Sequence, residues 1–182
     1  TLRSLGNFSS LQREIGMPNS ANYLSVAGAF NYAEAAVVRV PPDAVEGNSV
    51  DERSRYIIDK FESLIENKAG TLLLFSSKRQ MEQVYDELSR DLHKLILIQG
   101  QYSNREMVRL HKERVDQGRT SILMGLASFA EGVDLPGDYC KHVVIAKLPF
   151  AVPDDPLHEA LSEWIEARGG NSFFDISLPI AS

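Results

Sequence analysis

Short apolar runs alternate with amphipathic segments of helical length along the chain from residue 71 onward. The run from Thr71 to Phe75 is continuous and apolar, which is typical of a strand buried on both faces. Strands that alternate with helices in this way pair in parallel and carry helices on both faces of the sheet. The sequence therefore predicts an α/β domain with a mostly parallel sheet. The expected strands cover residues 71–75, 95–98, 122–124 and 142–147.

Serine-initiated capping boxes mark the points at which three helices should begin. In such a box the serine side-chain oxygen accepts a hydrogen bond from the backbone N–H of the residue three positions later. The Glu or Gln side chain of that residue can in turn accept a hydrogen bond from the backbone N–H of the serine. The boxes pair Ser49 with Glu52, Ser77 with Gln80 and Ser103 with Glu106. The expected helices cover residues 9–15, 50–67, 77–92, 103–116 and, after an N-cap at Asp155, 156–168; β-like pieces are expected at 35–40 and 174–178.

Composition bounds the size and the environment of the protein. Its 182 residues suit one domain, and we expect a leading segment over residues 1–48 before a core over 49–182. The formal net charge of −6 argues against binding nucleic acid by bulk charge, although it leaves room for a local basic patch. Cys140 is the only cysteine, which excludes an internal disulfide and fits a reducing, cytoplasmic location. No apolar run is long enough to cross a membrane, and Thr1 in place of an initiator methionine indicates that the chain starts inside a longer one.

Two serines follow the first expected strand, at the start of the next helix. Unpaired amides and the helix dipole attract anions at such a position. Ser76 and Ser77 therefore fit a site for a nucleic-acid phosphate. The same serines fit plain helix capping, worth about 1 kcal/mol, and the local pattern alone favours this second interpretation.

A polar loop containing Gln101 follows the second expected strand, and a basic helix face comes after it. Arg105, Arg109 and Lys112 recur at helical spacing on that face, opposite its apolar residues. A basic face beside a capped helix start suits a phosphate track. A solvated face explains the pattern equally well, because two glutamates dilute the charge.

Two carboxylates flank a glycine in the loop that follows the third expected strand. Glu131 and Asp134, on either side of Gly132, fit general acid/base chemistry, a metal site or hydrogen bonds to sugar hydroxyls. The metal interpretation is weak, because no third ligand is near in sequence. Acids that cap backbone amides of the loop are the structural alternative.

Several familiar sites are absent from the sequence. The glycines from Gly132 to Gly137 have the spacing of a P-loop, but Asp138 stands where the phosphate-binding lysine is required. No strand ends in the Asp-Glu pair that holds magnesium. Cys140 and His142 form a lone C-x-H pair, which is not a zinc site, and the four histidines show no catalytic-triad spacing. The sequence thus predicts no metal site within this chain.

In content and in order, these stretches resemble the iron–sulfur branch of the superfamily 2 helicases, the XPD/DinG family. The stretch from Gly125 to Gly137, with Ser128, resembles motif V of that family, and it is the most specific match. Thr1-Leu2 resembles the end of motif III, residues 72–77 resemble motif IV, and residues 99–105 resemble the loop and helix that follow motif IV. Lys147-Leu148-Pro149-Phe150 and Asp155-Pro156 together resemble the strand end and turn after motif V.

The resemblance implies the second RecA-like motor domain of an ATP-driven, 5′-to-3′ DNA helicase that acts on forked DNA and R-loops in repair. By matched position, Glu131, Gly132 and Asp134 would face the ATP cleft, with Asp134 toward the ribose. Single-stranded DNA would lie along Ser76, Ser77, Gln101, Arg105 and Ser128, with Lys147 as a further candidate. ATP and Mg²⁺ would be shared with the first RecA-like domain of the parent chain, which would also hold a [4Fe–4S] cluster.

The family's P-loop, magnesium-binding acids, cluster cysteines and arginine finger are all missing from these residues. One cysteine cannot hold a [4Fe–4S] cluster. We therefore expect a fragment that neither hydrolyses ATP nor unwinds DNA alone. Two other functions compete with a helicase motor. A non-catalytic nucleic-acid-binding or interaction module would lack a P-loop upstream, and a free-standing α/β enzyme would need a complete site, which the chain does not offer.

Overall fold

The computed structural model describes residues 6–18, 20–44, 49–65, 70–148 and 156–178. These residues belong to two compact units, which are considered separately. One is Val40–Leu148, and the other combines Thr1–Arg39 with Pro149–Ser182. The boundary expected after residue 48 stays a prediction.

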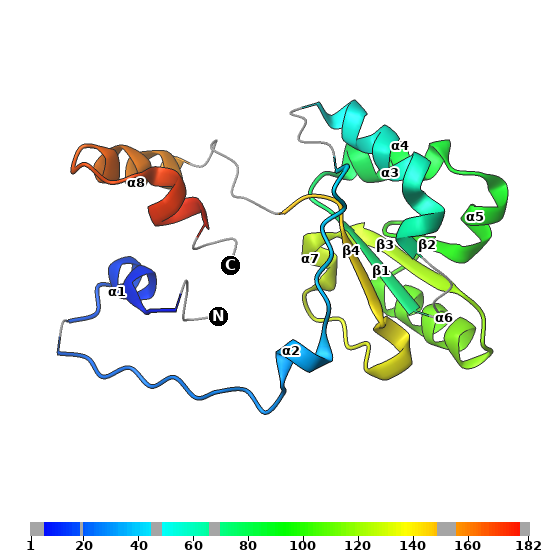
Figure 1. Cartoon of the computed structure of the whole chain (residues 1–182), viewed down its shortest axis with the longest axis horizontal. Coiled ribbons are helices and arrows are strands. Elements are labelled where there is room, and N and C mark those ends of the chain that lie inside the picture. The colour runs from blue at the N-terminus through cyan, green and yellow to red at the C-terminus, as the bar shows by residue number, and fades with distance from the viewer. Residues whose placement is uncertain (1–5, 19, 45–48, 66–69, 149–155, 179–182) are drawn as a thin grey trace. The chain divides into compact units, whose positions relative to one another are not determined.

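The unit Val40–Leu148 is built on a parallel sheet of four strands (Figure 1). The strand order is β2-β3-β1-β4, and every neighbouring pair is parallel. Four predicted strands are thereby confirmed, with small shifts at their ends. Their bounds are β1 Gly70–Phe75, β2 Ile96–Ile98, β3 Ser121–Leu126 and β4 His142–Ile145.

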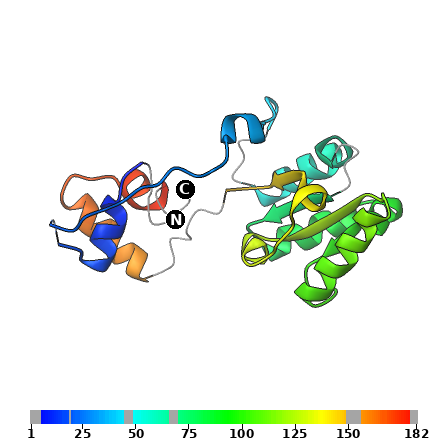
Figure 2. The ribbon, with the colours of Figure 1, turned by 90° about the horizontal axis from the view of Figure 1, so that it is seen from below.

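Helices cover both faces of this sheet, as the alternation predicts. Figure 2 shows α3 (Val50–Ile65) and α6 (Asn104–Asp116) on opposite sides of the strands. On the α3 side, Leu73 and Phe75 are buried in one apolar cluster with residues of α3 and of α4 (Lys78–Glu87). On the other side, Leu72 is buried with residues of α6 and of the short helix α7 (Ala127–Ala130). The continuous apolar run of β1 therefore fills two cores at once.

The predicted serine caps are present at three helix starts. The hydroxyl oxygens of Ser49, Ser77 and Ser103 accept hydrogen bonds from the backbone three residues on, at 3.4, 3.4 and 3.3 Å. The prediction of one helix over residues 77–92 was wrong, because Leu88 is extended between α4 and α5 (Arg90–Leu95). The hydroxyl of Ser89 accepts from the backbone N–H of Leu92 at 3.4 Å and so starts the second helix.

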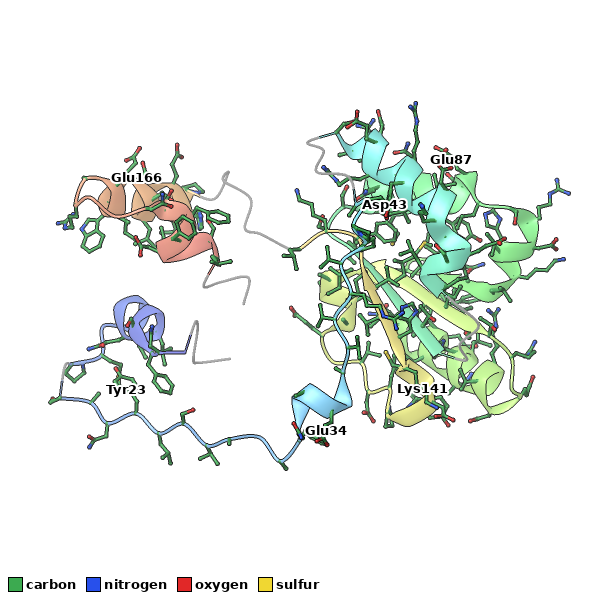
Figure 3. The ribbon with its side chains drawn as sticks, viewed as in Figure 1. Tyr23, Glu34, Asp43, Glu87, Lys141 and Glu166 are labelled. Carbon is green, nitrogen blue, oxygen red and sulfur yellow. The ribbon has the colours of Figure 1, made fainter. Side chains whose placement is uncertain are left out.

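Asp43, which precedes α3 in the chain, contacts two residues of that helix (Figure 3). Its carboxylate accepts a hydrogen bond from the Tyr56 hydroxyl at 3.0 Å and lies 2.9 Å from the Lys60 ammonium. The Lys60 ammonium and the Tyr56 hydroxyl both hold the pKa of Asp43 below its usual value.

The second unit contains α1 (Ser9–Ile15), α2 (Tyr32–Ala35), α8 (Pro156–Glu166) and η2 (Phe173–Ser177), a π-helical turn. The helices predicted over residues 9–15 and from Pro156 are confirmed. The end of α8 is joined to η2 by a hydrogen bond of 2.6 Å from the Ser172 hydroxyl to Glu166, a residue labelled in Figure 3.

Two predicted β-like pieces were wrong. Of the piece predicted over residues 35–40, Ala35 ends α2 and residues 36–40 form no strand. Val37 and Val38 are 79% and 90% exposed, since no neighbouring strand in the described structure pairs with them. Residues 173–177 form the turn η2 instead, which Asn171 and Asp175 close through two hydrogen bonds of 2.8 Å. Within the described residues, no helix has the length and apolar character needed to cross a membrane.

Candidate functional site

The candidate residues gather at one edge because all neighbouring strands are parallel. Phe75 pairs with Leu126, and Ile98 pairs with Met124, so β1, β2 and β3 end close together. The segments that follow these strands leave the sheet at its carboxyl edge, where open α/β sheets bind ligands. All the predicted site residues belong to these three segments, and Lys147 follows β4 at the same edge.

The first segment places Ser77 at the N-cap of α4. The Ser77 hydroxyl accepts from the backbone N–H of Gln80 at 3.4 Å, so the capping interpretation is correct. A cap occupies only one of the first backbone N–H groups of a helix, and the others have no partner within the helix. Ser76 is exposed and Ser77 half-buried, so the helix start remains accessible to an anion.

The second segment turns sharply after β2 and carries Gln101. Gly100 has a φ of +100°, a left-handed conformation that favours glycine, and the N–H of Gln101 donates to the Ile98 carbonyl at 3.1 Å. Gln101 is exposed, as is Arg105 in the first turn of α6. The turn therefore presents Gln101 to solvent, and the start of α6 presents Arg105.

The basic face of α6 is smaller than its sequence indicates. Arg109 is held by carboxylates of its own helix, at 2.6 Å from Glu106 and in a closer ion pair with Glu113. The hydrogen bond to Glu106 raises the pKa of the Arg109 guanidinium, and Arg109 lowers the pKa of Glu106. Within the described part of the chain, Arg105 has no such ion pair, so it is the better candidate for a phosphate.

The third segment carries Ser128 on α7 and then the acidic loop. Phe129 is buried against Gly125, where a β-carbon would lie 2.9 Å from the aromatic ring, so β3 needs a glycine at this point. Ser128 is exposed. The buried phenylalanine thus anchors a short helix whose other side faces solvent.

The acidic loop depends on a glycine with a left-handed backbone. Gly132 has a φ of +80°, and Glu131 and Asp134 on either side of it are exposed. Neither acid has a salt bridge to another residue in the described ranges. No group of three His, Cys, Asp or Glu residues in those ranges is arranged to hold a metal ion. The two carboxylates are therefore open to a ligand outside the chain.

The sequence interpretation missed Gln99. Its backbone N–H donates to the Met124 carbonyl at 2.8 Å, and its side-chain oxygen accepts from the N–H of Leu126, also at 2.8 Å. Gln99, the first residue of the second segment, is therefore bonded to β3 at two residues, and the later of them, Leu126, directly precedes the third segment. A polar residue directly after a buried strand was the available signal, but the partner of its side chain is set by tertiary structure.

His111 was also missed, and it belongs to the opposite end of β3. Its Nδ1 lies 2.8 Å from the Ser121 hydroxyl, and its Nε2 lies 2.7 Å from the Tyr139 carbonyl oxygen. A carbonyl only accepts, so Nε2 carries the proton and Nδ1 accepts from Ser121. Burial lowers the pKa of His111 and favours this neutral form. The residue joins α6, β3 and the turn η1 (Gly137–Cys140), which is a structural role.

Several residues of the sequence motifs lie outside the described residues. They are Thr1 and Leu2, Pro149 and Phe150 after Leu148, and Asp155. Lys147 is described and is exposed after β4, where the N–H of Ala146 donates to the Leu74 carbonyl at 2.9 Å.

Comparison with known proteins defines the class to which this site belongs. The family model described as the helicase C-terminal domain matches residues 61–182. The ATP-dependent DNA helicase DinG of Photobacterium profundum is 39% identical over 188 residues, which cover 100% of this chain and 27% of the relative. The same-named helicase of Escherichia coli (strain K12) is 36% identical over 189 residues, covering 100% and 26%.

The parallel sheet and these matches show a helicase C-terminal domain with an α/β, RecA-like fold. More narrowly, the chain belongs to the XPD/DinG family of helicases. It spans about a quarter of the length of the curated relatives it matches, at 27% and 26% of the two relatives above.

Proposed function

We propose that this chain is the second motor domain of an ATP-dependent DNA helicase that moves 5′ to 3′. The main support is that three polar segments lie together at the carboxyl edge of the sheet, where the paired strands β1, β2 and β3 end. The relatives are named ATP-dependent DNA helicases. The direction of movement and a role on forked DNA and R-loops in DNA repair rest on the family resemblance.

In this proposal, one strand of DNA runs along the first two segments and α7. Ser76 and Ser77 lie at the start of α4, where the first backbone N–H groups have no partner within the helix, which suits a phosphate. Gln101 adds an exposed amide, and Arg105 adds a guanidinium that forms no salt bridge with another described residue. Ser128 adds an exposed hydroxyl. A local track of this kind is compatible with a net charge of −6, because it needs only a few contacts.

The nucleotide lies at the acidic loop, between this domain and the first RecA-like domain of the parent chain. Glu131 and Asp134 are exposed on either side of Gly132, and Asp134 accepts from a ribose hydroxyl. Mg²⁺ is held by the first domain, which supplies the phosphate-binding loop. By the family resemblance, that domain also carries the [4Fe–4S] cluster; the single cysteine here, Cys140, falls short of the four that a cluster needs. The parent works in the cytoplasm, and this chain alone is inactive.

A titration of the chain with fluorescent single-stranded DNA tests the nucleic-acid track. We expect binding that weakens with salt, and that weakens severalfold further in Ser77→Ala and in Arg105→Ala. Arg105→Ala should also lower the slope of log affinity against log salt by about one, as expected for one lost phosphate contact.

Two variants at the start of α5 provide matched controls for this titration. Ser89→Ala removes a serine cap with the same 3.4 Å geometry, and Arg90→Ala removes an exposed arginine from the next position. Both should bind DNA like the unmodified chain. Equal affinities for all four variants would refute the track at Ser77 and Arg105.

A further inference from the structure

Gln99 ends the pairing of β2 with β3 in an unusual way. The residue pairs of these strands stop at Ile98 and Met124, and the backbone N–H of Gln99 then donates to the Met124 carbonyl. In a regular parallel ladder, the next bond would run from the N–H of Leu126 to the main-chain oxygen of Gln99. Here the side-chain oxygen of Gln99 accepts that bond at 2.8 Å.

Because the side-chain oxygen of Gln99 takes the place of its main-chain oxygen, the backbone after β2 can turn away from β3 while a hydrogen bond still joins the two strand ends. The backbone after Gln99 turns away at Gly100, whose φ is +100°, and leads to Gln101. Leu126 meanwhile serves as the N-cap position of α7, and its own side chain makes no capping hydrogen bond. The amide of Gln99 thus fixes the residue at which β3 ends and α7 begins.

We infer that Gln99 is a positioning residue that couples the DNA-binding loop to the nucleotide-binding loop. A shift of the turn at Gly100 moves Gln99, and Gln99 is bonded directly to the N–H of Leu126, from which α7 and then Glu131 follow. The coupling acts through one hydrogen bond and two rigid strand ends. This inference rests on the proposed helicase function of the same edge.

Two variants of Gln99 separate its hydrogen bond from its bulk. Gln99→Leu keeps a side chain of similar size but has no acceptor, whereas Gln99→Glu keeps an oxygen that can accept from Leu126. In the full-length gene product, we expect Gln99→Leu to lower the stimulation of ATP hydrolysis by saturating single-stranded DNA by about tenfold. Gln99→Glu should restore the stimulation to within about twofold of the unmodified protein.

Hydrogen exchange of the same proteins gives a readout that does not depend on catalysis. The Leu126 amide should exchange at least about tenfold faster in Gln99→Leu, with smaller increases over residues 127–134, and Gln99→Glu should restore its protection. Gln83→Leu is the matched control, because Gln83 is a half-buried glutamine of α4 whose amide bonds to Glu87 at 3.3 Å. It should alter neither readout.

The outcomes distinguish the positioning role from the proposed function. Unchanged exchange at Leu126 in Gln99→Leu, or an equal loss of stimulation in the Leu and Glu variants, overturns the role of Gln99. Absence of DNA-stimulated ATP hydrolysis in the unmodified protein overturns the proposed function instead, and the exchange data then still decide whether Gln99 positions α7.

Discussion

Gly70→Ala should strongly destabilise the unit Val40–Leu148. A β-carbon on Gly70 would lie 2.2 Å from the Tyr139 carbonyl oxygen and 2.6 Å from that of Asp138. Both obstacles are backbone atoms of η1, and the carbonyl of Gly70 also accepts from the N–H of Lys141 at 3.2 Å. Relief therefore requires moving η1 away from β1, and we expect a loss of at least about 3 kcal/mol in the free energy of unfolding.

Urea unfolding followed by circular dichroism measures this loss. Gly137→Ala is the matched control, because Gly137 lies in the same turn with a φ of +60°, and a β-carbon added there would have no atom within 4 Å. Backbone strain alone should cost that variant about 1 kcal/mol. Similar midpoints for the two variants would show that close approach to η1 does not explain the glycine at position 70.

His111→Leu should cost about 3 kcal/mol in the free energy of unfolding. The substitution roughly keeps the buried volume but removes the partner of the Ser121 hydroxyl and of the Tyr139 carbonyl. Each polar group left buried without a partner costs about 1–3 kcal/mol. Urea unfolding measures this loss of stability. The substitution alters no residue of the proposed DNA or nucleotide site.

The double variant His111→Leu with Ser121→Ala tests this account of the loss. Removing the hydroxyl that was left without a partner should recover part of the stability, so the double variant is expected to be more stable than His111→Leu alone. If the two losses simply add, the hydrogen bond between His111 and Ser121 does not stabilise the unit.

Local patterns in the sequence predicted most of the sheet and its helix starts. The continuous apolar run Thr71–Phe75 is shorter than a typical helix, and a strand covered on one face would alternate, so the run predicts a strand buried on both faces. The serine caps at Ser77 and Ser103 depend on residues three positions apart, so they too could be predicted. The break at Leu88 could not, because the apolar spacing of a helix continues across it from α4 into α5.

Tertiary contacts decided the features that the sequence did not predict. The valines at 37 and 38 favour a strand, but a strand also needs a partner, and the described structure offers none. A better signal existed for His111, which stands four residues from both Met107 and Val115 on the buried side of α6. For the candidate site, the predicted ends of the parallel strands were enough to predict where the polar residues gather. The pairing of Arg109 and the bond from Leu126 to Gln99 depend on side-chain positions.

In the proposed function, the carboxyl edge of this sheet serves ATP as well as DNA. The most direct measurement is ATP hydrolysis by the full-length gene product with and without single-stranded DNA, in Glu131→Gln and Asp134→Asn. We predict DNA-stimulated hydrolysis in the unmodified protein and a loss of at least about tenfold in both variants. Asp59→Asn and Glu62→Gln, at exposed positions of α3, should match the unmodified protein. Absent stimulation, or Glu131 and Asp134 variants as active as these controls, would contradict the claim.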